Sequence, residues 1–177
     1  MTDPAPARVV GLDLSLRSTG IADADGKAFT VKAEGNDYER MALVRAAVLA
    51  IIPWDIEVVM IEAPIAHLKG NSILKLAGLG AVVRQALYDE GIAFLDVQPA
   101  TVKIYATGSG KGNKYGVIQA AEKRLGYEGL SDDEADALWL RAIGADLLGV
   151  PVTYVPDHHT RALNALRETA PIKRRTP

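Results

Sequence analysis

The chain has 177 residues, hydrophobic residues at 49% of positions and a net charge of −2 at pH 7. This length and composition are typical of one globular domain with a substantial core. The absence of cysteine excludes disulfides, cysteine nucleophiles and thiolate metal sites. No apolar run reaches the roughly 20 residues that span a bilayer, and residues 1–7 lack the layout of a signal peptide. We therefore expect a soluble cytoplasmic protein with no membrane partner.

The basic residues are unevenly placed along the chain. An isoelectric point near 5.9 argues against a general nucleic-acid binder. Between residues 101 and 124, however, Glu122 is the only acid, against the bases Lys103, Lys111, Lys114, Lys123 and Arg124. A second basic cluster, residues 173–175, lies near the C-terminus. A phosphate-rich ligand is therefore compatible with the local charge.

The pattern of apolar residues and turn signals predicts strands and helices in a mixed order. Strands are expected at residues 8–14, 19–24, 28–33, 57–62 and 92–97, and helices at 38–52, 72–90, 100–105, 114–125 and 131–148. A strand-like segment is expected from residue 152. Three strands followed by alternating helices and strands predict an α/β fold, a mixed five-stranded sheet flanked by α-helices. We expect a flexible tail at 1–7, one domain at 8–156 and a loosely attached basic tail at 157–177.

Two of the predicted strands end in a carboxylate. Asp13 closes the apolar run VVGLD, and Glu62 closes VVMIE. Ligands gather at the carboxyl ends of strands in open α/β sheets, and a buried carboxylate needs a partner or a metal ion. Either residue alone is better explained by structure, Asp13 as a turn cap and Glu62 as half of an ion pair.

A second group of acids opens the helix predicted after residue 131. Ser131 and Glu134 match a capping box, which accounts for Glu134 as well as for the neighbouring Asp132. Asp133 and Asp136 lie three residues apart and share a helix face. Asp136 also begins the apolar stripe of Leu140, Ile143 and Leu147, so it is expected to face the core.

If Asp13, Glu62, Asp133 and Asp136 meet at one sheet edge, their charges repel unless a divalent cation lies among them. Oxygen ligands favour Mg²⁺, with Mn²⁺ as a substitute. The histidines do not form a zinc motif: His67 is interpreted as a loop residue, and His158 and His159 as a surface pair.

Four segments together resemble the RuvC-type Holliday-junction resolvases, whose fold is RNase H-like. They are GLDLSLRSTGIA (11–22), VVMIEAP (58–64), PATVKIYATGSGKGNKYGVIQA (99–120) and DEADALWLRAIG (133–144). The resemblance implies a homodimeric endonuclease that cuts four-way DNA junctions with two Mg²⁺ ions per site and leaves 5′ phosphates. It also implies a bacterial or phage-infected cell as the setting.

The resemblance carries over to single residues. The family's four metal-binding acids match Asp13, Glu62, Asp133 and Asp136, and its two lysines near the scissile phosphate match Lys103 and Lys114. We expect Lys114 to balance charge on the phosphate and Lys103 to anchor the DNA backbone. Two loop lysines, Lys111 and Lys69, are expected to position DNA. Where several family members carry an aromatic wedge, this chain has Ile65, Ala66 and His67, which favours a broader range of branched DNA.

Other interpretations remain open at this point. The segment 11–20 also resembles the phosphate-binding hairpin of actin-like and sugar-kinase phosphotransferases. Those enzymes need two related lobes, and this chain shows no repeat, so we expect no nucleotide cofactor. A catalytically silent junction-binding module and a nuclease acting on RNA–DNA hybrids are further alternatives. The helix at 72–90 carries an apolar face that is explained either by core packing or by a dimer seam.

Overall fold

A computed structural model describes residues 6–64, 71–169 and 171. One mixed sheet forms its centre, with five strands in the order β3-β2-β1-β4-β5. The strands are β1 (Val9–Asp13), β2 (Ser18–Ala22), β3 (Ala28–Lys32), β4 (Val58–Glu62) and β5 (Phe94–Val97). The longer helices are α1 (Asp37–Ile51), α2 (Asn71–Asp89), α3 (Pro99–Thr107), α4 (Lys114–Leu125) and α5 (Asp132–Leu147). The predicted α/β class and five-stranded mixed sheet are confirmed.

The pairing of the strands places the ends of β1 and β4 side by side. β1, β2 and β3 form an antiparallel meander, whereas β1, β4 and β5 run parallel. The turn between β2 and β3 contains Gly26 at a φ of +91°, a backbone conformation that glycine adopts without strain. Because Leu12 pairs with Ile61, the residues that follow them, Asp13 and Glu62, end their strands at neighbouring positions.

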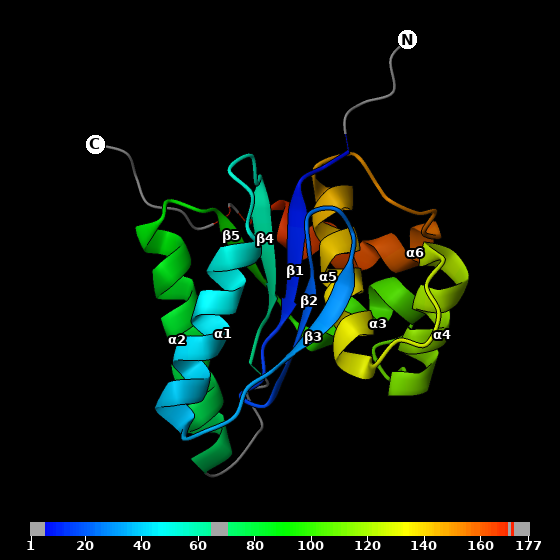
Figure 1. Cartoon of the computed structure of the whole chain (residues 1–177). Helices are drawn as coiled ribbons and strands as arrows, with labels where there is room; N and C mark the ends of the chain where they lie inside the picture. The colour runs from blue at the N-terminus through cyan, green and yellow to red at the C-terminus, as the bar shows by residue number, and fades with distance from the viewer. Residues whose placement is uncertain (1–5, 65–70, 170, 172–177) are drawn as a thin grey trace.

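Helices cover both faces of the sheet (Figure 1). Side chains alternate along a strand, so Val10 and Leu12 of β1 pack in a core cluster with α1 and α2. Val9 packs in the opposite cluster with α3, α4 and α5. Gly11 lies against α5, as the position of its absent Cβ shows. Asp13 follows in the same alternation and is directed to the α5 side.

The apolar face of α2 packs inside this chain. Val83 and Leu87 are buried, and Leu76 packs against the same cluster as α1 and the sheet. Core packing therefore explains most of the face that could have formed a dimer seam. No helix among the described residues has both the length and the apolar character needed to cross a membrane.

The segment after residue 152 differs from the expectation. It forms no strand; instead α6 (Asp157–Thr160), a 3-10 turn (Arg161–Leu163) and α7 (Asn164–Arg167) follow one another. Leu163 is fully buried in the cluster with α3 and α5. The prediction of His158 and His159 as a surface pair is wrong for His159, which is 8% exposed. Its Nδ1 lies 3.0 Å from the carbonyl oxygen of Tyr105, a partner too distant in sequence to be foreseen.

Candidate active site

Asp13 and Glu62 form a coupled pair at the carboxyl edge of the sheet. Burial, followed by the negative charges of Glu62 and Asp136, raises the pKa of Asp13 to about 8. Burial and the charge of Asp136 raise the pKa of Glu62 to about 7. The two carboxyl groups share a hydrogen bond that favours a proton on Asp13. Both strands thus place an acid where ionisation is costly, which is unusual for a purely structural residue.

Helix α5 brings two further acids to the same edge. Its N-terminus carries the predicted capping box, in which the Ser131 backbone N–H donates to Glu134 Oε2 over 2.9 Å. Burial and the charge of Asp132 raise the pKa of Asp136 to about 6. Asp133 Oδ2 accepts a hydrogen bond of 2.5 Å from Ser18 Oγ in β2. The charge of Asp133 also contributes to the raised pKa of Asp13, so Asp13 is affected by each of the other three acids.

Two glycines explain how α5 comes so close. A Cβ built on Gly11 would lie 2.0 Å from the carbonyl oxygen of Ala137, and one on Gly20 would lie 2.1 Å from that of Asp133. Any side chain at these positions would push the helix away from the sheet. Neither glycine was recognised from the sequence as a contact residue. Each lies two residues from another α5-facing residue of its strand, Gly11 from Val9 and Gly20 from Ala22, and this alternation is the signal that could have shown it.

The carboxylates do not form a closed ion cage as they stand. Among residues 6–64, 71–169 and 171, no three Asp, Glu or His side chains have the arrangement of a metal site. Asp133 is turned toward Ser18, and Asp13 is hydrogen-bonded to Glu62. The donor set still fits Mg²⁺, because the four acids offer carboxylate oxygens and the neighbouring Ser18 a hydroxyl oxygen. Rotation of Asp133 and loss of the shared proton would turn these oxygens toward a cation.

The predicted lysines Lys103 and Lys114 both act on the acids electrostatically. The charge of Lys103, in α3, lowers the pKa of Glu62 and Asp136, which places it near both. Lys114, the first residue of α4, is paired with Asp132, and this hydrogen bond raises its pKa. Lys111 is exposed in the loop before α4. Lys69, like residues 65–67, lies outside the described residues.

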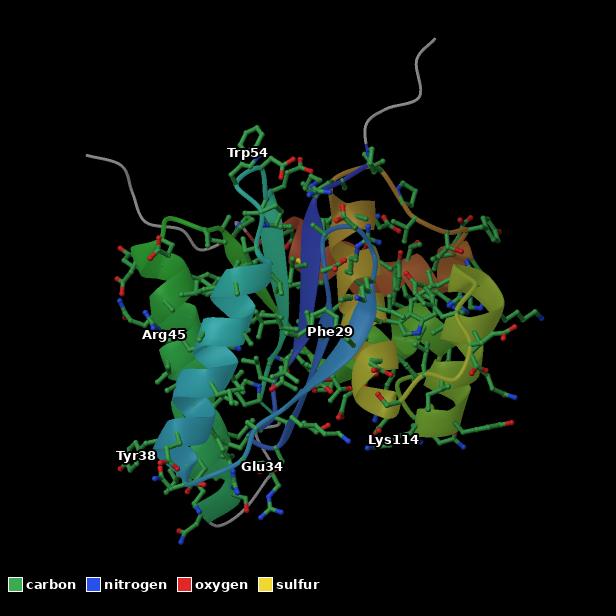
Figure 2. The ribbon with its side chains drawn as sticks, viewed as in Figure 1. Phe29, Glu34, Tyr38, Arg45, Trp54 and Lys114 are labelled. Carbon is green, nitrogen blue, oxygen red and sulfur yellow. The ribbon has the colours of Figure 1, made fainter. Side chains whose placement is uncertain are left out.

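Lys114 lies at the same edge of the molecule as the acids. Figure 2 shows it at the lower edge of the view, whereas Trp54, just before β4, is at the upper edge. Since β4 begins near Trp54 and ends at Glu62, the lower edge is the one to which β1 and β4 deliver their carboxylates. Positive and negative side chains therefore meet along this edge.

A cavity of about 470 Å³ extends from the acids toward α2. Asp13, Glu62 and Asp133 line one part of it, and Arg84 and Asp96 line another. Arg84 donates from Nε and Nη2 to one oxygen of Asp96 over 2.9 and 2.7 Å. This ion pair was not predicted from the sequence. Asp96 lies within the run FLDV, so the signal that identified Asp13 and Glu62, an acid in an apolar strand, was present.

No protein-family model and no curated protein sequence matches the chain. Its structure is similar to that of RuvC from Thermus thermophilus, with a TM-score of 0.65 and 19% identity over 93% of this chain and 99% of that one. It is equally similar to T. thermophilus RuvC solved in complex with a Holliday junction substrate, with a TM-score of 0.65 and 16% identity over 93% and 98% of the two chains. The expected fold is thus confirmed along nearly the whole length: this chain has the RNase H-like fold of RuvC.

Proposed function

We propose that the chain is a Mg²⁺-dependent endonuclease that cuts four-way DNA junctions and other branched DNA, leaving 5′ phosphates. The observation that carries this proposal is the group of buried, mutually repelling carboxylates at the sheet edge, with Lys103 and Lys114 beside them. The fold supports it, because a protein of this fold has been solved with a Holliday junction. The strongest alternative, an actin-like or sugar-kinase phosphotransferase, needs two related lobes, and this chain shows no internal repeat.

The four carboxylates Asp13, Glu62, Asp133 and Asp136 would hold the metal, with Mn²⁺ as a substitute for Mg²⁺ and two ions per site. When bound, the ions supply Lewis acidity for phosphodiester hydrolysis. The carboxylates themselves must give up their protons to bind. The raised pKa values of Asp13, Glu62 and Asp136 indicate that negative charge is unfavourable there, and a cation would relieve it.

The lysines act on the DNA. Lys114 would approach the scissile phosphate and stabilise the negative charge that develops on its oxygens. Its pairing with Asp132 keeps the ammonium at this edge and charged. Lys103 would hold the backbone close to Glu62 and Asp136, and Lys69 and the exposed Lys111 would contact neighbouring phosphates. Two copies of the chain, acting as a homodimer, would cut opposing strands.

The test compares cleavage of a four-way junction, a flap, a duplex and an RNA–DNA hybrid, each in Mg²⁺ and in EDTA. We expect Mg²⁺-dependent cleavage of the branched DNAs with 5′-phosphate products. Asp13→Asn should bind the junction with unchanged affinity in Ca²⁺ but fail to cut it. Preferential cleavage of the hybrid would support the alternative nuclease, and full cleavage by Asp13→Asn would contradict the proposed site.

A further inference from the structure

A second cavity, of about 380 Å³, lies beside the carboxylate edge and is rich in positive charge. Its charged lining comes from three elements: Arg17 from the β1–β2 connection, Asp37 and Arg40 from the start of α1, and Lys75 from the start of α2. We call it the basic pocket. Three cations and one carboxylate give it a formal charge of +2.

The three cations of the basic pocket differ in whether they form an ion pair. Lys75 Nζ lies 2.8 Å from Asp37 Oδ2, and Arg40 Nη1 lies 3.7 Å from Asp37 Oδ1. The Arg17 side chain is exposed and forms no ion pair or hydrogen bond with the described residues. Nε of Arg40 is buried and has no hydrogen-bond acceptor among them either. One carboxylate therefore pairs with two of the three cations, and donor capacity remains for an anion.

The basic pocket is continuous with the cleft that contains the acids. Ser15 and Leu76 line both cavities. Ser15 is two residues beyond Asp13, so the pocket opens immediately next to the site. It lies on the α1 and α2 side of the sheet, whereas Lys114 comes from α4, on the α5 side. Positive charge thus flanks the carboxylates on both sides.

We propose that the basic pocket binds a backbone phosphate of the strand being cut, one to three nucleotides from the scissile bond, with Arg17 as its main contact. This inference rests on the proposed nuclease function. An arginine fork suits a phosphate oxygen pair, and fixing a second phosphate would hold the strand in register over the carboxylates. Asp37 positions Lys75 and Arg40 and limits the positive charge.

The experiment measures binding to a four-way junction in Ca²⁺ over a range of salt concentrations. Arg17→Gln should weaken binding about 3- to 10-fold and lower the slope of log K against log [salt] by about 1. Arg45→Gln, an equal change of charge on an exposed part of α1 (Figure 2), is the control and should change affinity by less than about 1.5-fold. Asp37→Asn should tighten binding, because it removes the only acid lining the pocket among the described residues.

A methylphosphonate scan then locates the contact. One neutral linkage near the cut should weaken binding by the wild-type protein, and Arg17→Gln should lose no further affinity with that same DNA. Equal effects of Arg17→Gln and Arg45→Gln, or additive losses at every linkage, would overturn the proposal while the wild-type protein still cuts. If the wild-type protein neither binds nor cuts branched DNA, the proposed function fails first, and this inference fails with it.

Discussion

Asp13 is held at a cost in stability that depends on pH. In the unfolded chain it ionises near its ordinary pKa of about 4, whereas in the folded protein its pKa is about 8. Between these values the folded state binds more protons, so the stability of the metal-free protein falls as pH rises. We expect Asp13→Asn to be more stable than wild type by about 1–3 kcal/mol at pH 8 in EDTA, and therefore to unfold at a higher temperature.

The difference should shrink as pH falls toward 4 and disappear well below it, where Asp13 is protonated in both states. Thermal melts at pH 4, 6 and 8 measure it, and each sample should be repeated with Mg²⁺. The cation should stabilise wild type at pH 8 by binding only the folded state, and should stabilise Asp13→Asn less. A variant that is less stable than wild type in EDTA at pH 8 would show that burial of Asp13 is not costly.

The position of Lys114 leads to a separate prediction, which concerns the rate of DNA cleavage. It is 77% exposed and its known contact is Asp132, so its removal should not disturb the core. Lys114→Ala should lower the single-turnover cleavage rate about 10- to 100-fold, with junction affinity changed by less than about threefold. Lys123→Ala, in the last turn of the same helix, is the matched control. An equal loss of rate in both variants would reduce Lys114 to a general backbone contact.

At the level of single residues, the sequence was informative where chemistry is local. An acid that ends an apolar strand could be recognised, and Asp13 and Glu62 do lie side by side. The pairing of Lys114 with Asp132 could not be predicted, since it joins two helix N-termini 18 residues apart. The basic pocket was missed for the same reason, because Arg17, Arg40 and Lys75 come from three separate elements.

At the level of elements, the contact of α5 with the sheet determines where Asp133 and Asp136 lie. Gly20→Ala would place a Cβ 2.1 Å from the backbone oxygen of Asp133, too close for any real contact. We expect the variant to lose at least about 2 kcal/mol of folding stability and most cleavage activity, because Asp133 and Asp136 move with the helix. Gly110→Ala is the control for stability, as its Cβ would meet only the Ile104 side chain at 3.5 Å. Denaturant melts and cleavage rates measure both effects.

The helices and strands themselves were largely predictable from periodicity. Capping signals fixed the start of α5 at Ser131, and Gly91 and Gly126 mark where α2 and α4 end. The prediction failed beyond residue 152, where short helices replace the expected strand. That segment is held by long-range contacts, such as buried Leu163 against α3 and α5, which local pattern does not contain. Whether an apolar helix face packs inside one chain or between two is likewise decided by tertiary structure, as α2 illustrates.

At the level of the whole molecule, the charges form an arrangement that an acidic isoelectric point conceals. Lys103 and Lys114 lie on one side of the carboxylates and the basic pocket on the other. A nucleic-acid strand crossing this edge would meet positive charge, then the four acids, then positive charge again. Net charge is therefore a poor guide to DNA binding when the contact surface is small and local.

The last prediction concerns paired cutting of the two strands, which requires two active sites in one assembly. A plasmid that extrudes a cruciform loses it when nicked, since a single nick releases the supercoiling that sustains it. A homodimer that cuts both strands before dissociating should convert the plasmid to linear DNA. Mixing wild type with an excess of Asp13→Asn should form dimers with one active site and shift the product to nicked circles, at unchanged total junction binding. Nicked circles as the main product of wild type alone would show that the two cuts are independent. Sedimentation of the protein with and without junction DNA would then be expected to give the mass of a single chain.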